Sequence, residues 1–200
     1  MAIKNSFFVK SITDIKYSPF PRLKEIFLIG RSNVGKSFFI RVLTNNNKIS
    51  FVSKTPGKTS TLNYFLLNNS FYLIDSPGYG YMKKSKLSQR TVFPMIQNFL
   101  QKNKNIKMIL QIIDFKVGPT KMDLFITQEL AKHNFKLAII LNKSDKVSKN
   151  HILKQLNFIK NTFELSNYLN DIPMYLLSCK TKEGLREIES LVSKQMSLNN

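Results

Sequence analysis

The sequence predicts an α/β protein of three layers, a mostly parallel sheet with one antiparallel edge strand and helices on both faces. Short apolar runs alternate with longer segments of helical spacing along the 200 residues, which is typical of such sheets. Two of the runs are separated only by a short polar tip, which indicates an antiparallel hairpin. We expect one domain, residues 1–200, because a chain of this length buries roughly 70% of its surface and no linker-like segment divides it.

The expected elements follow in chain order. Residues 25–29 form an apolar run that ends at a glycine loop, and Lys36–Leu43 follows without helix breakers. The hairpin consists of Leu62–Leu67 and residues 71–74, with the polar tip 68–70 between them. Further strands are expected at 107–113, 136–141 and 172–176, each followed by ten or more residues of helical spacing.

The charge of the chain favours a polyanionic partner. Lys and Arg number 31 against 12 Asp and Glu, a net charge of +19. Such a field attracts nucleic acids and, to a lesser degree, anionic membrane surfaces. Coding bias is an alternative that explains lysine in place of arginine but does not explain the shortage of acids. No feature favours specificity for DNA, and we expect a monomer.

Residues with redox, metal or membrane chemistry are few. Cys179 is the single cysteine, so no intramolecular disulfide forms, and we interpret it as a packing residue in a cytoplasmic protein. His133 and His151 lack metal-ligand spacing and are expected on the surface. The longest apolar run, 137–141, is far shorter than the ~20 residues that span a bilayer, so we expect no membrane span.

The segment from Gly30 to Ser37 fits the pattern G-x-x-x-x-G-K-[ST], after a predicted strand and at the start of a predicted helix. Its glycines let successive N–H groups point inward around a phosphate chain. Lys36 would reach the β- and γ-phosphates, and Ser37 would offer its hydroxyl to Mg²⁺. The loop alone does not distinguish ATP from GTP.

Three further motifs lie at predicted strand ends, and therefore at one edge of the sheet. Asp75-Ser-Pro-Gly78 offers a carboxylate that holds Mg²⁺ through water and a glycine N–H for the γ-phosphate. Asn142-Lys143-Ser144-Asp145 offers an aspartate that accepts two hydrogen bonds from guanine, which adenine cannot supply. Ser178-Cys179-Lys180 would close over the base. Taken alone, each motif is also compatible with an ordinary surface loop.

Together these motifs occur in the order of small GTPases. With residues 54–59 (Lys-Thr-Pro-Gly-Lys-Thr), 75–80 (Asp-Ser-Pro-Gly-Tyr-Gly) and Asp114 through Thr120, the chain resembles the EngB/YihA/YsxC family of bacterial ribosome-assembly GTPases. The resemblance implies a P-loop GTPase domain, GTP/GDP and Mg²⁺ as ligands, and a partner in the large-subunit precursor or its rRNA. The chain departs from the family at Phe38 and Lys116, and it has no tryptophan.

The resemblance also implies a site. The residues expected to catalyse are Lys36, Thr59 and Gly78, with Thr59 as the switch threonine that senses Mg²⁺ and γ-phosphate. Mg²⁺ ligands are expected to be Ser37, Thr59 and, through water, Asp75. The nucleotide is expected to contact Gly30, Arg31, Ser32, Asn33, Val34, Gly35, Lys36, Ser37, Pro56, Gly57, Lys58, Thr59, Asp75, Ser76, Pro77, Gly78, Asn142, Lys143, Ser144, Asp145, Leu177, Ser178, Cys179 and Lys180.

Hydrolysis needs an oriented water and positive charge at the transition state. Tyr79 stands where Ras-like proteins carry the water-orienting glutamine, so we expect slow turnover. Asn33 is a candidate K⁺ ligand that would supply the charge, or it only shapes the loop. A second hypothesis is that GTP orders a basic, aromatic surface that binds rRNA, formed by Tyr79, Tyr81, Lys83, Lys84, Lys86 and Arg90. The alternative is an ordinary solvated loop with the two tyrosines packed below it.

Two other functions remain open. One is an rRNA-binding scaffold that depends on the nucleotide and turns over little. The other is an ATPase or nucleoside kinase, which Asp145 and the lack of an arginine-rich lid segment disfavour.

Overall fold

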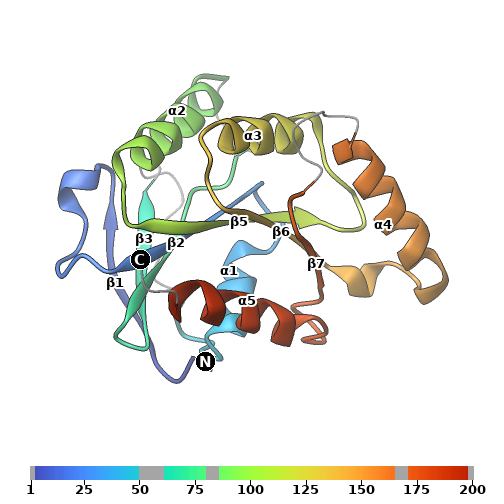
Figure 1. The fold of residues 1–200 in the computed structure, drawn as a ribbon, viewed down its shortest axis with the longest axis horizontal. Helices are drawn as coiled ribbons and strands as arrows, with labels where there is room; N and C mark the ends of the chain where they lie inside the picture. Colours follow the sequence, from blue (N-terminus) through green and yellow to red (C-terminus); the bar gives the residue numbers. More distant parts are fainter. Residues whose placement is uncertain (1–2, 50–60, 80–85, 165–170, 198–200) are drawn as a thin grey trace.

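A seven-stranded sheet forms the centre of the molecule, with the strand order β1-β3-β4-β2-β5-β6-β7 (Figure 1). The structure is a computed structural model that describes residues 3–49, 61–79, 86–164 and 171–197, with only the backbone given for 86–91. Its strands are β1 (Ser6–Ile12), β2 (Lys24–Gly30), β3 (Leu62–Leu67), β4 (Phe71–Asp75), β5 (Ile106–Asp114), β6 (Leu137–Asn142) and β7 (Met174–Leu177). Its helices are α1 (Lys36–Leu43), α2 (Lys86–Lys102), α3 (Lys121–Lys132), α4 (Lys149–Glu164) and α5 (Leu185–Ser197), with short 3₁₀ turns at Ile15–Tyr17 and Ser144–Lys146.

Helices cover both faces of this sheet, as Figure 1 shows. Helices α1 and α5 pack on one face, where Leu28 of β2 shares a buried cluster with Ile40 and Ile188. Helices α2 and α3 pack on the other face, against the neighbouring residue Phe27, and α4 buries Ile159 and Phe163 on that same side, beside β6. Strands that are buried on both faces read as continuous apolar runs. The three-layer α/β class predicted from the sequence is confirmed.

The direction of the strands follows the prediction with one correction. All neighbouring pairs from β4 to β7 are parallel, and β3 runs antiparallel to β4. However, β3 is not the edge strand, because β1 pairs antiparallel with its outer side. The expectation that the hairpin adds the edge strand was therefore wrong at this point. None of the helices in the described segments is long and apolar enough to cross a membrane.

A buried carboxylate lies near the start of β2, away from the glycine loop at its other end. Glu25 is 1% exposed and accepts a hydrogen bond from the Asn103 side chain, with the Tyr64 hydroxyl at 3.5 Å. Burial raises its pKa from 4.5 to about 7, although Asn103, Arg22 and Tyr64 favour the charged form. Between pH 4.5 and about 7, the folded protein therefore keeps the Glu25 carboxyl protonated, whereas the unfolded chain releases this proton.

This proton makes the stability depend on pH. As pH rises from 4.5 to 7, the unfolded chain binds fewer protons at this site than the folded one, so the free energy of unfolding falls, by about 3 kcal/mol in total. Glu25→Gln is expected to remove this loss, and to stabilise the protein above pH 7 more than at pH 4.5. Urea unfolding at several pH values measures it, with exposed Glu164→Gln as the control. An unchanged pH slope in Glu25→Gln would contradict the assignment.

Candidate nucleotide-binding site

The glycine loop between β2 and α1 is shaped by close contacts that only glycine permits. Gly35 precedes the helix with φ +105°, and a Cβ there would lie 2.5 Å from Asn142 Nδ2. That amide donates to the carbonyl of Val34 at 2.9 Å, so the loop is fastened to the end of β6. The loop and the start of α1 have the local structure that the sequence predicts.

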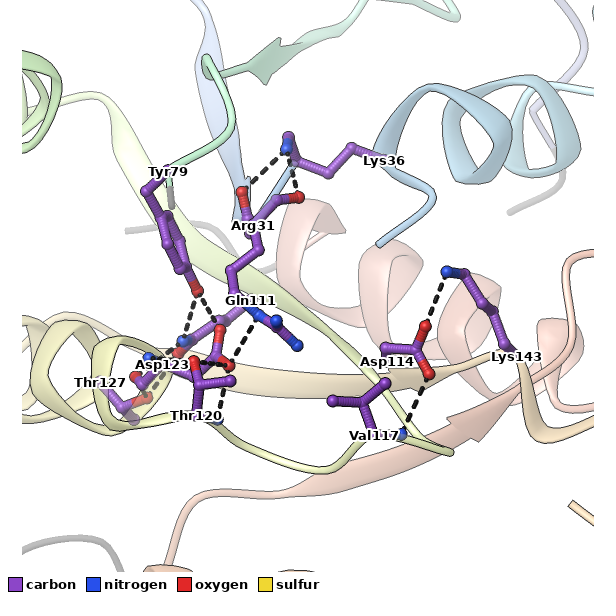
Figure 2. A network of polar contacts seen from close by, with 11 residues as sticks. Arg31, Lys36, Tyr79, Gln111, Asp114, Val117, Thr120, Asp123, Thr127 and Lys143 are labelled. Carbon is purple, nitrogen blue, oxygen red and sulfur yellow. Dashed lines mark hydrogen bonds and ion pairs between the residues drawn. The ribbon is translucent and has the colours of Figure 1, made fainter. Parts of the chain in front are cut away.

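Lys36 reaches back with its side chain to the first residues of this loop. It is the first residue of α1 and 8% exposed, and its Nζ donates to the carbonyls of Gly30 (2.8 Å) and Arg31 (3.2 Å), as Figure 2 shows. Burial lowers the pKa of Lys36, and the nearby Asp75 carboxylate opposes this shift. Lys36 begins a helix whose N-terminus favours anions, and its ammonium group reaches back to the carbonyls of Gly30 and Arg31.

Asp75 ends β4 on the same side of the sheet as Lys36. Its Oδ1 atom is buried and has no hydrogen-bond partner among the described residues. Burial raises its pKa to about 6, and Lys36 acts in the opposite direction. A buried carboxylate oxygen that lacks a partner suits Mg²⁺, which prefers oxygen ligands. Ser37, in the first turn of α1, is exposed, and the predicted residues 56–59 lie outside the described part of the chain.

The segment after Asp75 lies directly on the glycine loop. Ser76 N–H donates to the carbonyl of Leu28 at 3.1 Å, and a Cβ on Gly78 would lie 2.8 Å from the Ser32 nitrogen. The Ser32 N–H donates to the carbonyl of Tyr79 at 3.0 Å. Gly78 thus lies where its backbone faces the loop that the sequence assigns to the phosphates.

Asn142 and Lys143, at the end of β6, contact the end of β5 and the segments that follow β2 and β7. Besides its bond to Val34, the Asn142 side chain accepts a hydrogen bond from the Cys179 N–H at 3.3 Å. Lys143 has φ 69° and donates from Nζ to the Asn33 carbonyl (2.8 Å) and to Asp114 Oδ2 (2.7 Å). The strand register places Asp114 opposite Asn142. The contact between Asp114 and Lys143, the residue after Asn142, therefore follows from the pairing of β5 with β6.

Asp145 is exposed and held by a buried serine. Its Oδ1 accepts a hydrogen bond from Ser178 Oγ at 2.7 Å, and Ser178 is 0% exposed. The buried Ser144 Oγ has no partner among the described residues. Ser178 and Cys179 follow buried Leu177 at the end of β7, while Lys180 is exposed. The carboxylate of Asp145 is thereby positioned at the rim while remaining open to a ligand.

Other predictions have mixed outcomes. Cys179 is buried, and burial raises the pKa of its thiol to about 12, which agrees with a packing role. His133 and His151 are exposed, as expected. The exposed Asn33 has a left-handed backbone, φ 67°, which asparagine tolerates and which agrees with a loop-shaping role. The K⁺ hypothesis stays a prediction.

Tyr79 corrects the hypothesis of an exposed switch surface. Its side chain is 4% exposed, and its hydroxyl donates to Asp123 Oδ1 at 2.8 Å (Figure 2). It therefore cannot present a ring to RNA in this conformation, and it packs in the core, as the alternative proposed for this residue. Lys86 and Arg90 lie in α2 rather than in a loop, and residues 81–84 lie outside the described residues.

Asp123 joins Arg31 of the glycine loop to Tyr79, and nothing in the sequence identifies it as a site residue. A single aspartate in a helical segment carries no motif, and only its position three residues after Thr120 indicates a helix cap. The structure brings residues 30–37, 75–78, Asp114, 142–145 and 178–180 together at one rim of the sheet, formed by the carboxyl ends of β2, β4, β5, β6 and β7, while 54–59 lie outside the described residues.

The comparisons with known proteins agree on one family. Residues 25–143 match the family model described as a 50S ribosome-binding GTPase. The chain is 40% identical over 197 residues to the "Probable GTP-binding protein EngB" of Acholeplasma laidlawii, covering 98% of this chain and 99% of that one. It is 39% identical over 193 residues to the protein of the same name from Clostridium kluyveri, covering 96% and 98%.

Solved structures give the same result for the fold. The crystal structure of a "probable GTP-binding protein engB" has a TM-score of 0.71 and 27% identity, covering 86% of this chain and 98% of that one. The Era protein of Aquifex aeolicus has a TM-score of 0.66 and 22% identity, covering 90% and 58%, and it shows likeness of fold alone. Because the chain carries the site motifs and is 39–40% identical to EngB proteins over nearly its whole length, it belongs to the EngB family of GTP-binding proteins and is a GTPase.

Proposed function

We propose that this GTPase is a slow conformational switch in the cytoplasm that acts in the assembly of the large ribosomal subunit. The observation that carries the proposal is the meeting of a phosphate loop, Asp75 to Gly78, and Asp145 at one sheet rim. These parts suit the phosphates, the metal and the base of one guanine nucleotide. The matching family model is described as a 50S ribosome-binding GTPase, which supports the choice of partner.

In the proposed binding mode, the phosphates and the base of the nucleotide contact different groups of residues. Lys36 and the loop amides bind the phosphates, and the Gly78 N–H donates to the γ-phosphate alone. At the other end, the Asp145 carboxylate accepts from guanine N1 and N2, and the segment Ser178 to Lys180 covers the base. The carboxylate accepts two hydrogen bonds from guanine. Adenine has no donors at these positions, so its binding would leave the carboxylate oxygens unpaired and is disfavoured.

Mg²⁺ belongs to the same proposal. Ser37, Thr59 and, through water, Asp75 would hold it, and the buried Asp75 oxygen without a described partner supports this choice. When bound, the metal would neutralise charge on the phosphates. The residues of the site would position the nucleotide next to Mg²⁺, and Lys36 would supply a further positive charge.

Slow turnover follows from the position of Tyr79. A glutamine at this place orients the attacking water in Ras-like proteins, but the Tyr79 hydroxyl is buried and bonded to Asp123. No water can be oriented by a group that is turned into the core. We therefore propose that the ribosomal partner completes the site, and that the net charge of +19 draws the chain to rRNA.

Binding to ribosomal particles tests this function. We expect the full chain to co-sediment with large subunits at least about fivefold more tightly with GTPγS than with GDP, a typical coupling between two sites. We also expect the subunits to accelerate single-turnover GTP hydrolysis. Equal sedimentation with GTPγS, GDP and no nucleotide would contradict the switch. Nucleotide-dependent binding without acceleration would instead support the scaffold.

A further inference from the structure

Asp123 is a buried charge at the first turn of α3. It is 0% exposed, and its Oδ2 accepts hydrogen bonds from the Thr120 N–H (2.7 Å) and hydroxyl (2.6 Å). The bond from the Thr120 N–H and the reciprocal bond from the Asp123 N–H to Thr120 Oγ1 (3.4 Å) form a capping box, which stabilises the start of the helix. A cap needs only one carboxylate oxygen and is usually solvated, so capping does not explain complete burial or the use of Oδ1.

Within the described part of the chain, the two other contacts of this carboxylate come from the nucleotide site. Arg31 Nε lies 3.0 Å from Oδ2, an ion pair rather than an aligned hydrogen bond, and the Tyr79 hydroxyl donates to Oδ1 at 2.8 Å. In Figure 2 both side chains reach toward Asp123 from the loop segments above it. A single buried carboxylate therefore joins the phosphate loop to the segment that follows Gly78.

Gln111 of β5 completes the surroundings of the Tyr79 hydroxyl. Its Nε2 donates to that hydroxyl at 3.1 Å and to the Asp123 carbonyl at 3.1 Å, and Thr127 donates to its Oε1 at 2.7 Å. The hydroxyl thus both donates and accepts inside the core. Burial and the Asp123 charge raise the Tyr79 pKa well above its usual value, which keeps this donor protonated.

Holding this ring also holds the backbone beside it. The Tyr79 carbonyl accepts from the Ser32 N–H at 3.0 Å, and Tyr79 forms a parallel bridge with Arg31. Gly78, one residue earlier, approaches Ser32 so closely that a Cβ would lie 2.8 Å from its nitrogen. The Tyr79 ring, its backbone and Gly78 are therefore held next to the phosphate loop by contacts within two consecutive residues.

We propose that Asp123 is a positioning residue of the GTPase site, which anchors Tyr79 and Arg31 and so fixes the Gly78 amide for the γ-phosphate. The inference rests on the proposed function, because it takes the Gly78 N–H as the γ-phosphate donor. Fixing that donor in advance favours the nucleotide that carries a γ-phosphate. The network therefore contributes to the preference for GTP over GDP, besides any contribution to stability.

The test compares two buried tyrosines that each lose one hydroxyl hydrogen bond. Tyr79→Phe removes the bond to Asp123 and keeps the ring in the core. Tyr72→Phe is the matched control, since its hydroxyl donates to the Pro21 carbonyl at 3.3 Å and it lies in the same hydrophobic cluster. We expect Tyr79→Phe to weaken GTPγS binding by about threefold to tenfold with GDP binding changed less than about twofold. Tyr72→Phe is expected to change neither affinity.

Asp123→Asn provides a second variant. It removes the charge that pairs with Arg31, and it is expected to reproduce the selective loss of GTPγS affinity. Loss of GTPγS and GDP binding to the same extent in the folded Tyr79→Phe variant, or no loss at all, would overturn the positioning role. Wild-type protein that bound neither nucleotide would instead overturn the proposed function, and the inference with it.

Discussion

Replacing Lys36 by methionine is expected to weaken binding of GTP and GDP by at least about 30-fold, because loss of one partner of a buried charged contact costs about 2–5 kcal/mol. The ammonium group donates to the carbonyls of Gly30, at the end of β2, and Arg31. Both nucleotides carry the β-phosphate that it would bind. Displacement of a fluorescent GDP analogue measures both affinities.

The free protein should tolerate this change better than the complex does. Burial lowers the pKa of Lys36, which means that the charge is disfavoured in the folded chain without a ligand, and methionine keeps the stem packed. Lys160→Met, on the exposed side of α4, removes the same charge and serves as the control. Affinities of Lys36→Met within tenfold of the wild type would contradict the placement of the phosphates.

Replacing Asp145 by asparagine is expected to change which base is bound. The variant should lose about 1,000-fold in affinity for GTP, because a site built to pair with polar groups rejects a base that leaves them unpaired. Its amide nitrogen would donate to the extra carbonyl oxygen of xanthine, so XTP should bind better than GTP. The Ser178 hydroxyl bond to this side chain can be kept by the amide oxygen.

Competition between GTP and XTP for the variant and the wild type measures this exchange. Asp171→Asn is the matched control, since Asp171 is exposed and precedes β7, at the end of that strand opposite Ser178. It should leave the order of affinities unchanged. An Asp145→Asn protein that folds and still prefers GTP would show that the base is recognised elsewhere.

Local chemistry explains why much of this fold could be predicted. The helix Lys36–Leu43 was predicted to the residue, since a glycine loop with positive φ at Gly35 both ends the strand and starts the helix. The hairpin strands β3 and β4 were also found within one residue. In each case the signal lies within a few residues of the element that it defines.

Elements that depend on distant partners could not be predicted in this way. Strand β1 buries only Ser6 and Ile12, and its register shifts between Phe8 and Lys10, so its side chains do not alternate as a period of two requires. Its pairing with β3 is what makes it a strand. The edge of the sheet was accordingly assigned to the wrong strand.

The same limit applies to the site. The four motifs could be predicted to share one rim because each ends a strand or follows one directly. The bond between Tyr79 and Asp123 joins residues 44 positions apart, and its existence depends on how α3 packs over β5. From the sequence alone, Tyr79 could equally be exposed, and one hypothesis placed it on an RNA-binding surface.

The central claim is that this rim binds one guanine nucleotide, and competition between GTP and ATP for the wild-type chain tests it most directly. With a fluorescent GDP analogue bound in the presence of Mg²⁺, GTP should displace the probe at a concentration at least about 100-fold lower than ATP does. Equal displacement by the two nucleotides would contradict the role of Asp145 and the switch that depends on it.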